Sequence, residues 1–302
     1  MKRVTGTWGL CVLFKDHDLI ICARNGSPLI IGKGDDETFV SSDPHALSQH
    51  TQNIFFLEDG DMAVITKSGI DITRLEGGSS DTSITVLEEE WGEAEMAGYP
   101  HYMLKEIHEQ PEALRRCISG RLDYKNGSSK LGGLKLEPVR LHSATHVRLI
   151  GCGTALNACK IGQLAIENLA RIPAVAHVAS EFRYNNSVIN PNAIHFAVSQ
   201  SGETADTLSA VKEIQLKGGS VHGIVNVVGS SIARLCGQGV YIHSGPEQAV
   251  ASTKAFTNMV GALLLFAIRM GRTRSFSREK GQLIVKNFEK IPDLMEKYLS
   301  NP

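Results

Sequence analysis

The sequence has no excess of charge of either sign. Its 31 lysines and arginines are balanced by 32 aspartates and glutamates, which gives a net charge of -1. A protein without a basic surplus has no electrostatic attraction to nucleic acid or to an anionic membrane surface, so we expect neither as a partner. A site for a negatively charged ligand therefore has to be built locally.

Long apolar runs and closely spaced cysteines are missing too. The most apolar stretch, Met259 to Ile268, is too short to cross a bilayer, and Met1-Lys2-Arg3 does not lead into an uninterrupted signal segment. The six cysteines are scattered at positions 11, 22, 117, 152, 159 and 236, with no Cys-x-x-Cys pair. This usage predicts a cytoplasmic protein without a cysteine metal site.

What is present is the composition of a globular protein, with 42% hydrophobic and 21% charged residues. A chain of 302 residues suffices for one large or two ordinary domains.

The most informative stretch runs from Ile194 to Thr207. Ile194 to Val198 is nearly continuous apolar sequence, as in a central strand of a parallel sheet that is buried on both faces. Residues 199–202 are small or polar, and from Glu203 an apolar stripe follows at helical spacing. The stripe consists of Ala205, Leu208, Val211 and Ile214. Gly218-Gly219 ends the predicted helix.

A strand that turns through Ser199-Gln200-Ser201-Gly202 into a helix brings free backbone amides, the positive end of the helix dipole and hydroxyl groups to one point. Ser199, Ser201 and Thr204 each supply a hydroxyl that donates to a phosphate oxygen, and Gly202 lets the backbone come close. The alternative is that Ser201 is an ordinary helix cap, with the following glutamate in the first helical turn.

Residues 1 to about 75 have the pattern of short strands separated by turns. The expected strands are 7–14, 19–23, 29–31, 53–57, 62–66 and 70–74. This piece is mostly antiparallel and contains too little helix to form a second layer over the sheet, so we interpret it as incomplete.

From residue 76 to about 138 the composition turns polar, as in a linker between domains. Residues 99–111 predict a helix that stops at Pro111. His101 and His108 share one face of that helix, but with no third ligand beside them we predict no metal site.

From residue 139 to 302 strands alternate with helices, which predicts an α/β fold with a doubly wound parallel sheet. The expected strands are 147–150, 174–178, 194–198, 221–227 and 240–243, with a loop at 180–184. The expected helices are 155–170, 203–217, 229–236 and about 252–269. The first of these has apolar positions at Leu156, Ile161, Leu164 and Leu169.

Ligands of such sheets bind beyond the carboxyl ends of the strands. The loops predicted there are 151–155, 199–204, 229–231 and 245–252, and all are rich in serine, threonine and glycine. A dinucleotide is disfavoured, because Gly151 and Gly153 are not followed by a third glycine at Leu156. Hydroxyl-lined turns suit a phosphosugar better, and we predict no cofactor.

Three segments together resemble the first sugar isomerase (SIS) module of the glutamine-fructose-6-phosphate aminotransferase family. They are Gly151-Cys152-Gly153-Thr154, Ser199 to Leu208, and Val250 to Thr257. The resemblance implies binding of fructose 6-phosphate. In that family an amidotransferase domain releases ammonia from glutamine, and two SIS modules convert fructose 6-phosphate into glucosamine 6-phosphate.

The family pattern also implies which residues contact the sugar phosphate. Those matching the phosphate loop are Ser199, Gln200, Ser201 and Thr204, and those lining the sugar are Thr154, Val250 and Ser252. Ala155 stands where many family members have serine, which removes one expected hydroxyl contact.

Residues 1–75 resemble the second half of an amidotransferase domain with an N-terminal cysteine nucleophile. The likeness lies in 23–32, 41–47 and 57–61. In the family the nucleophile follows the initiator methionine, whereas here Lys2 follows Met1 and Cys11 lies inside an expected strand. We therefore assign no glutaminase residue, and we expect glutamine as a substrate only of a complete enzyme.

The family's second SIS module, with its proton-transfer groups, has no counterpart in the chain, so we assign no catalytic residue. Lys254 and Glu203 are interpreted as structural. The main hypothesis is a part of an aminotransferase that is inactive by itself and pairs as a homodimer through the SIS module. The alternative is a stand-alone phosphosugar sensor.

Overall fold

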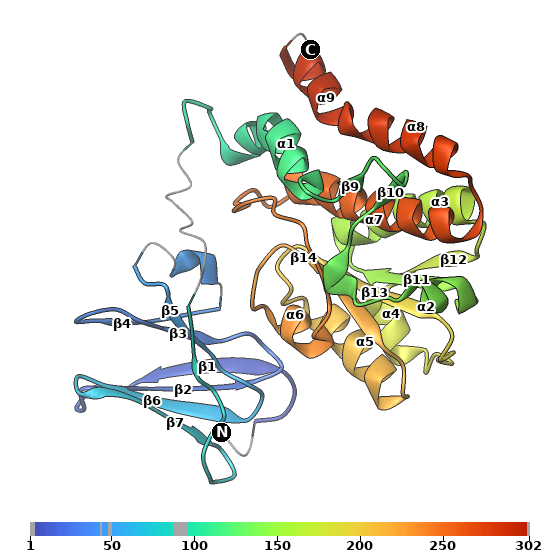
Figure 1. Ribbon diagram of the computed structural model, residues 1–302. Coiled ribbons are helices and arrows are strands. Elements are labelled where there is room, and N and C mark those ends of the chain that lie inside the picture. Colours follow the sequence, from blue (N-terminus) through green and yellow to red (C-terminus); the bar gives the residue numbers. More distant parts are fainter. Residues whose placement is uncertain (1–3, 43, 48–49, 87–95, 301–302) are drawn as a thin grey trace. The chain divides into compact units, whose positions relative to one another are not determined.

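The computed structural model describes residues 4–42, 44–47, 50–86 and 96–300 (Figure 1). The chain divides into two compact units, residues 1–94 and 95–302. Each unit has hydrophobic clusters of its own.

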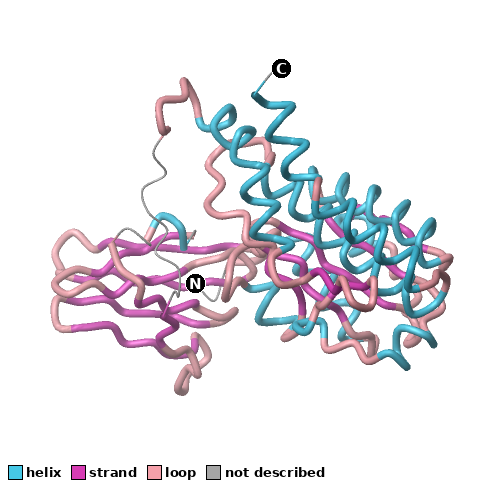
Figure 2. The backbone as a smooth tube through the Cα atoms, turned by 45° about the horizontal axis from the view of Figure 1, so that its top comes forward, coloured by secondary structure: helices cyan, strands magenta, loops and turns pink. Residues whose placement is uncertain are grey.

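The described part of the first unit forms two four-stranded antiparallel sheets, whose strands are magenta in Figure 2. One sheet has the order β1-β2-β6-β7, with β1 at Trp8–Leu13, β2 at Leu19–Asn25, β6 at Asp61–Thr66 and β7 at Gly69–Arg74. The other has the order β4-β3-β5-β8, with β3 at Ile30–Lys33, β4 at Thr38–Ser41, β5 at Asn53–Phe56 and β8 at Ile84–Val86. A short 3-10 helix, η1, covers Pro44–Ala46.

The two sheets of the first unit share one hydrophobic cluster. Cys22, Ala63 and Ile65 come from the first sheet, and Ile31 comes from the second. The expectation that helices would be needed for a second layer was wrong, because a second sheet provides that layer. All six expected strands are present, whereas β4 and β8 were not predicted.

The second unit is built around a five-stranded parallel sheet with the order β12-β11-β13-β14-β15. The strands are β11 at Val147–Gly151, β12 at Ala174–Val178, β13 at Ile194–Ser199, β14 at Val221–Val225 and β15 at Gly239–Tyr241. The predicted doubly wound parallel sheet is confirmed. The strand order reverses between β11 and β13, so this fold places its ligand crevice at their carboxyl ends.

Helices cover both faces of the parallel sheet (Figure 1). On one face lie α3 at Gly153–Ala170 and α7 at Lys254–Arg274, and on the other lie α4 at Ala179–Tyr184, α5 at Ala205–Leu216 and α6 at Ser231–Cys236. Further helices are α1 at Tyr102–Ile118, α2 at Pro138–Ser143, α8 at Arg278–Glu289 and α9 at Ile291–Ser300. A hairpin of β9 (Leu122–Asp123) and β10 (Ser128–Ser129) precedes a 3-10 helix, η2, at Gly132–Leu134.

The expected end of a helix at Pro111 was wrong, because α1 continues through this residue to Ile118. Proline has no amide hydrogen, so the carbonyl of Ile107 loses its helical partner. The side chain of Gln110 replaces that partner, and its Nε2 donates to the Ile107 carbonyl at 2.9 Å. The expected loop at residues 180–184 is helix α4 instead.

Two of the four apolar positions of α3, Ile161 and Leu164, are exposed, whereas Leu156 and Leu169 are half-buried. The buried positions of this helix include Ala158, Gly162 and Ile166. A Cβ added at Gly162 would lie 2.7 Å from a methyl carbon of Leu263 in α7. At Gly162 the two helices therefore pack too closely for a larger side chain.

Within the described residues, no helix combines the length and the apolarity that a membrane crossing requires.

Candidate functional site

The candidate site lies in the loops that leave the carboxyl ends of the parallel strands. Thr154 stands in the first turn of α3, directly after β11, and residues 199–204 connect the neighbouring β13 to α5. Val250 and Ser252 lie between β15 and α7. Thr154 and residues 199–204 are therefore on the edge of the sheet where this fold takes its ligands, and Val250 and Ser252 lie in the loop that follows the last strand.

Hydroxyl groups organise the turn from β13 to α5. The Oγ of Ser199 is 2.9 Å from Oγ1 of Thr204 and accepts the amide hydrogen of Gly202 at 3.0 Å. The Oγ of Ser201 accepts the amide hydrogen of Glu203 at 3.2 Å. Of the two hydroxyl hydrogens in the Ser199–Thr204 pair, one lies between the two oxygens and the other points elsewhere. The turn is thus preorganised and keeps donors for an anion.

Ser201 is not the N-cap of α5, so the alternative in which it serves only as an ordinary helix cap does not describe this turn. The N-cap residue is Thr204, and its side chain makes no capping bond to the helix, because it pairs with Ser199. The amides of the first helical turn are therefore left without a side-chain cap, as in the anion sites at helix N-termini.

Gly202 joins this turn to the next loop of the site. Its φ is +68°, and a Cβ at this position would lie 2.0 Å from Oγ of Ser230. The Gly202 carbonyl accepts the amide hydrogen of Ile232 at 2.9 Å. Glu203 caps α6, since its Oε1 accepts the amide hydrogen of Ser231 at 2.7 Å. This contact gives Glu203 a structural role.

Asn226 links the turn to the loop between β15 and α7. Its amide hydrogen is donated to the carbonyl of Gln200 at 3.0 Å. Its side chain accepts from the amide of Ser244 at 2.8 Å and donates to the carbonyl of Gly245 at 2.9 Å. With 3% exposure, Asn226 holds two loops of the candidate site in a fixed relation.

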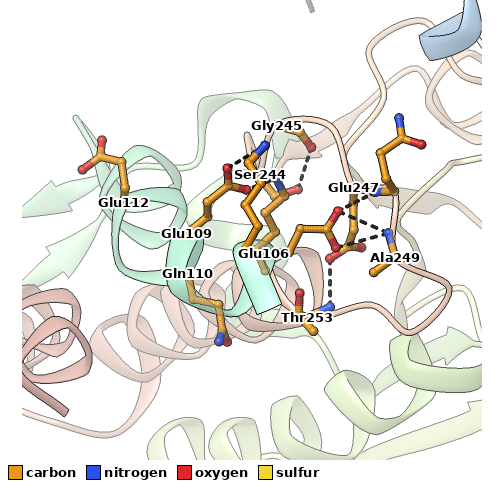
Figure 3. Close-up of polar contacts among 12 residues, drawn as sticks. Glu106, Glu109, Gln110, Glu112, Ser244, Gly245, Glu247, Ala249 and Thr253 are labelled. Carbon is orange, nitrogen blue, oxygen red and sulfur yellow. Dashed lines mark hydrogen bonds and ion pairs between the residues drawn. The ribbon is translucent and has the colours of Figure 1, made fainter. Parts of the chain in front are cut away.

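The loop from residue 244 to 253, here called the β15–α7 loop, is held by carboxylates (Figure 3). Glu247 Oε1 accepts the amide hydrogens of Thr253 at 2.8 Å and Ala255 at 3.1 Å at the start of α7. Glu106, from α1, accepts the amide hydrogens of Gln248 and Ala249. These anchors were missed from the sequence, because no local pattern marks a contact between residues 142 positions apart.

Lys254 is held in an ion pair with α1. Its Nζ lies 2.6 Å from Oε2 of Glu109, and only 4% of its side chain is exposed. Burial raises the pKa of Glu109, but hydrogen bonds and charges from Lys254 and Lys105 outweigh that effect, so the pKa lies below its usual value. This geometry gives Lys254 a structural contact.

The two histidines considered as metal ligands have other contacts. Nδ1 of His101 accepts the amide hydrogen of Leu104 and caps α1, and His108 stacks on Tyr99. No group of three or more histidine, cysteine, aspartate or glutamate side chains suited to a metal ion occurs in the described part of the chain.

The chain is similar to known proteins over nearly its whole length. Residues 140–269 match the SIS domain family. The chain is 41% identical over 97% of its length to a protein of Chlorobaculum tepidum named glutamine-fructose-6-phosphate aminotransferase (isomerizing), covering 48% of that relative. It is 40% identical over 99% of its length to a Thermus thermophilus protein of the same name, covering 49% of it.

Among solved structures, the chain is similar to the C-terminal domain of glucosamine-fructose-6-phosphate aminotransferase from Francisella tularensis. The TM-score is 0.62 and the sequence identity is 33%, over 67% of this chain and 57% of the other. The chain spans about half the length of the curated relatives it matches.

Proposed function

Because this chain contains a SIS domain and is homologous to the glutamine-fructose-6-phosphate aminotransferases, we propose that it supplies the fructose 6-phosphate-binding module of such an enzyme. One observation carries the proposal. The turn from β13 to α5 gathers three hydroxyl groups and an uncapped helix start at the point where the strand order reverses.

In the proposed complex, the β13–α5 turn holds the phosphate and other loops line the sugar. The phosphate contacts are Ser199, Gln200, Ser201 and Thr204, and the sugar contacts are Thr154, Val250 and Ser252. The complete enzyme aminates fructose 6-phosphate with ammonia from glutamine and isomerises the product to glucosamine 6-phosphate. We assign none of its proton transfers to this chain, and we propose that the 302-residue polypeptide by itself makes no glucosamine 6-phosphate.

We keep the proposed division of the chain into three segments. Residues 1–75 correspond to the later part of an amidotransferase domain, 76–138 to a linker with a helix, and 139–302 to the first SIS module. The two antiparallel sheets of the first unit support the first assignment. The proposed location is the cytoplasm, in agreement with six free cysteines.

We also propose that the chain pairs with a second copy through its SIS module. Ile161 and Leu164 on α3 have 40% and 60% of their surface exposed, and Val175 on the edge strand β12 has 44%. Exposed aliphatic side chains on an α/β unit favour an interface. Sedimentation equilibrium tests this: the wild type should be a dimer, and Leu164→Glu should shift it to a monomer. A monomeric wild type would contradict the proposal.

Calorimetric titration with fructose 6-phosphate tests the binding function. We expect binding to the 302-residue chain, and we expect Ser201→Ala to weaken it about tenfold, the worth of one hydrogen bond to a charged group. Ser143→Ala, at an exposed serine of α2, is the control and should bind as the wild type does. A wild type that binds no fructose 6-phosphate would overturn the proposed function.

A further inference from the structure

Helix α1 places a buried carboxylate against the β15–α7 loop. Glu106 has 2% of its surface exposed. Its Oε1 accepts the amide hydrogens of Gln248 at 2.6 Å and Ala249 at 3.2 Å, and its Oε2 lies 3.3 Å from the same Ala249 amide. Figure 3 shows the carboxylate of Glu106 directed from α1 at the backbone of the loop. Helix α1 precedes the segment that matches the SIS family, residues 140–269.

A carboxylate is costly to bury unless its oxygens accept hydrogen bonds, and backbone amides are costly to leave without acceptors. Here each group satisfies the other. Two consecutive amides that point at one carboxylate also fix the backbone torsions between them. Glu106 therefore holds the middle of the β15–α7 loop, while Asn226 holds its beginning and Glu247 its end.

The held amides lie directly before the residues proposed to line the sugar. Ala249 is followed directly by Val250. The side chain of Val250 is fully exposed, so packing against neighbours does not fix its position. Ser252 comes two residues later, and its Oγ accepts the amide hydrogen of Phe256 at 3.1 Å. The position of Val250 is therefore set by the anchors of the loop backbone, whereas Ser252 is also held by its own bond to α7.

The phosphate end of the proposed site is joined to the β15–α7 loop through Asn226, but its other supports are its own. Its turn is held by the pair of Ser199 and Thr204 and by the contacts of Gly202 and Glu203 with the loop before α6. Within the loops of the site, the carboxylate of Glu106 accepts hydrogen bonds from the amides of residues 248 and 249. Apart from Asn226, the two ends of the site thus have different supports.

We propose that Glu106 is a positioning residue for the sugar end of the phosphosugar site, acting through the β15–α7 loop. The proposal rests on the proposed function and extends it. It gives helix α1, which lies outside the SIS segment, a role in sugar recognition. The carboxylate sets the loop for the sugar and leaves the phosphate turn unchanged.

The test compares two probes, fructose 6-phosphate and inorganic phosphate, on the full chain and on Glu106→Gln. The substitution keeps the shape of the side chain but removes the charge that two amides share. We expect the affinity for fructose 6-phosphate to fall at least tenfold and that for inorganic phosphate to change less than twofold. Hydrogen exchange at the amides of Gln248 and Ala249 should become faster. Glu112→Gln, at an exposed carboxylate of the same helix, is the matched control.

The outcomes separate the two proposals. If the wild type binds fructose 6-phosphate and Glu106→Gln binds it equally well, the positioning role is overturned and the proposed function stands. An equal loss of affinity for both probes also overturns the role, since it would reflect general destabilisation. If the wild type binds no fructose 6-phosphate, both proposals fall. If Glu106→Gln does not fold, the test uses Glu106→Asp, whose shorter side chain moves the carboxylate away from the two amides by one methylene. This variant has to show the same selective loss of affinity for fructose 6-phosphate.

Discussion

Gly202 is the residue at which two loops of the candidate site touch. A side chain there meets two obstacles, a φ of +68° and Oγ of Ser230 at 2.0 Å from the added Cβ. We expect Gly202→Ala to lower the free energy of unfolding by about 3 kcal/mol, since the left-handed backbone costs about 1–2 kcal/mol and the overpacking about 1–3 kcal/mol. Urea denaturation measures this change.

A control separates the two causes. Gly218 has a φ of +78° with no atom within 4 Å of an added Cβ, so Gly218→Ala should cost only the backbone strain, about 1–2 kcal/mol. Adding Ser230→Gly to Gly202→Ala should restore part of the lost stability. Equal effects of the two single alanine variants would show that the contact with Ser230 is unimportant.

Two buried histidines make the stability of the second unit depend on pH. His195 and His222 have 1% and 2% of their surface exposed, and burial lowers the pKa of each to about 4. In the unfolded chain both titrate near their usual value of about 6.5. The unfolded state therefore binds more protons between about pH 6.5 and pH 4, so stability is complete above about pH 6.5 and is lost as the pH falls through this range.

We expect this loss to reach about 2–3 kcal/mol for each histidine. Urea midpoints measured from pH 7.5 to pH 4 should fall less steeply for His222→Leu than for the wild type. His142→Leu, at an exposed histidine, should keep the wild-type slope. An unchanged slope in His222→Leu would contradict the assignment of the pH dependence to this residue.

At the scale of elements, the strand-turn-helix unit at 194–216 was predictable because its signals are local. The apolar run forms β13, and Leu208, Val211 and Ile214 are buried as the helical stripe predicted. Ala205 of the same stripe is exposed. The glycines after Leu216 end the helix, and Gly218 has positive φ. Local patterns also placed every strand of the parallel sheet.

The elements and faces that were missed depend on partners far away in the sequence. The buried face of α3 is set by α7, where Gly162 meets Leu263. The continuation of α1 past Pro111 buries Leu114 and Cys117 in the main hydrophobic cluster, together with residues of α7 such as Met259. A periodic count of apolar residues sees neither effect, because both arise from packing and hydrogen bonding in three dimensions.

Asn226 joins two loops of the candidate site, and its substitution tests that connection. Asn226→Asp keeps an oxygen for the amide of Ser244 but removes the donor to the carbonyl of Gly245. A carboxylate buried against that carbonyl should cost about 1–3 kcal/mol of stability. Because the two loops form the candidate site, we also expect the affinity for fructose 6-phosphate to fall about tenfold or more. A factor of ten corresponds to about 1.4 kcal/mol of lost binding free energy. Asn192→Asp, at an exposed asparagine, should leave both quantities unchanged.

At the scale of the molecule, the candidate site and its supports lie in one unit. The proposed phosphate and sugar contacts, Asn226, Glu247 and Glu106 all fall within residues 95–302. Helix α1 also contributes Leu114, Cys117 and Ile118 to the main hydrophobic cluster of that unit. The SIS segment at 140–269 therefore does not contain the whole support of its own loops.

Dissecting the chain tests this view of the molecule. A fragment of residues 95–302 should bind fructose 6-phosphate as tightly as the full chain, since it keeps α1 and every proposed contact. A fragment of residues 140–302 lacks Glu106 and exposes the apolar surface that α1 and the core leucines of residues 122–136 cover, so it should bind much more weakly and unfold at a lower urea concentration. Adding a synthetic peptide of residues 99–119 should restore part of its affinity. Equal binding by the two fragments would show that the sugar loop keeps its shape without α1, because the loop amides would then be satisfied by other acceptors.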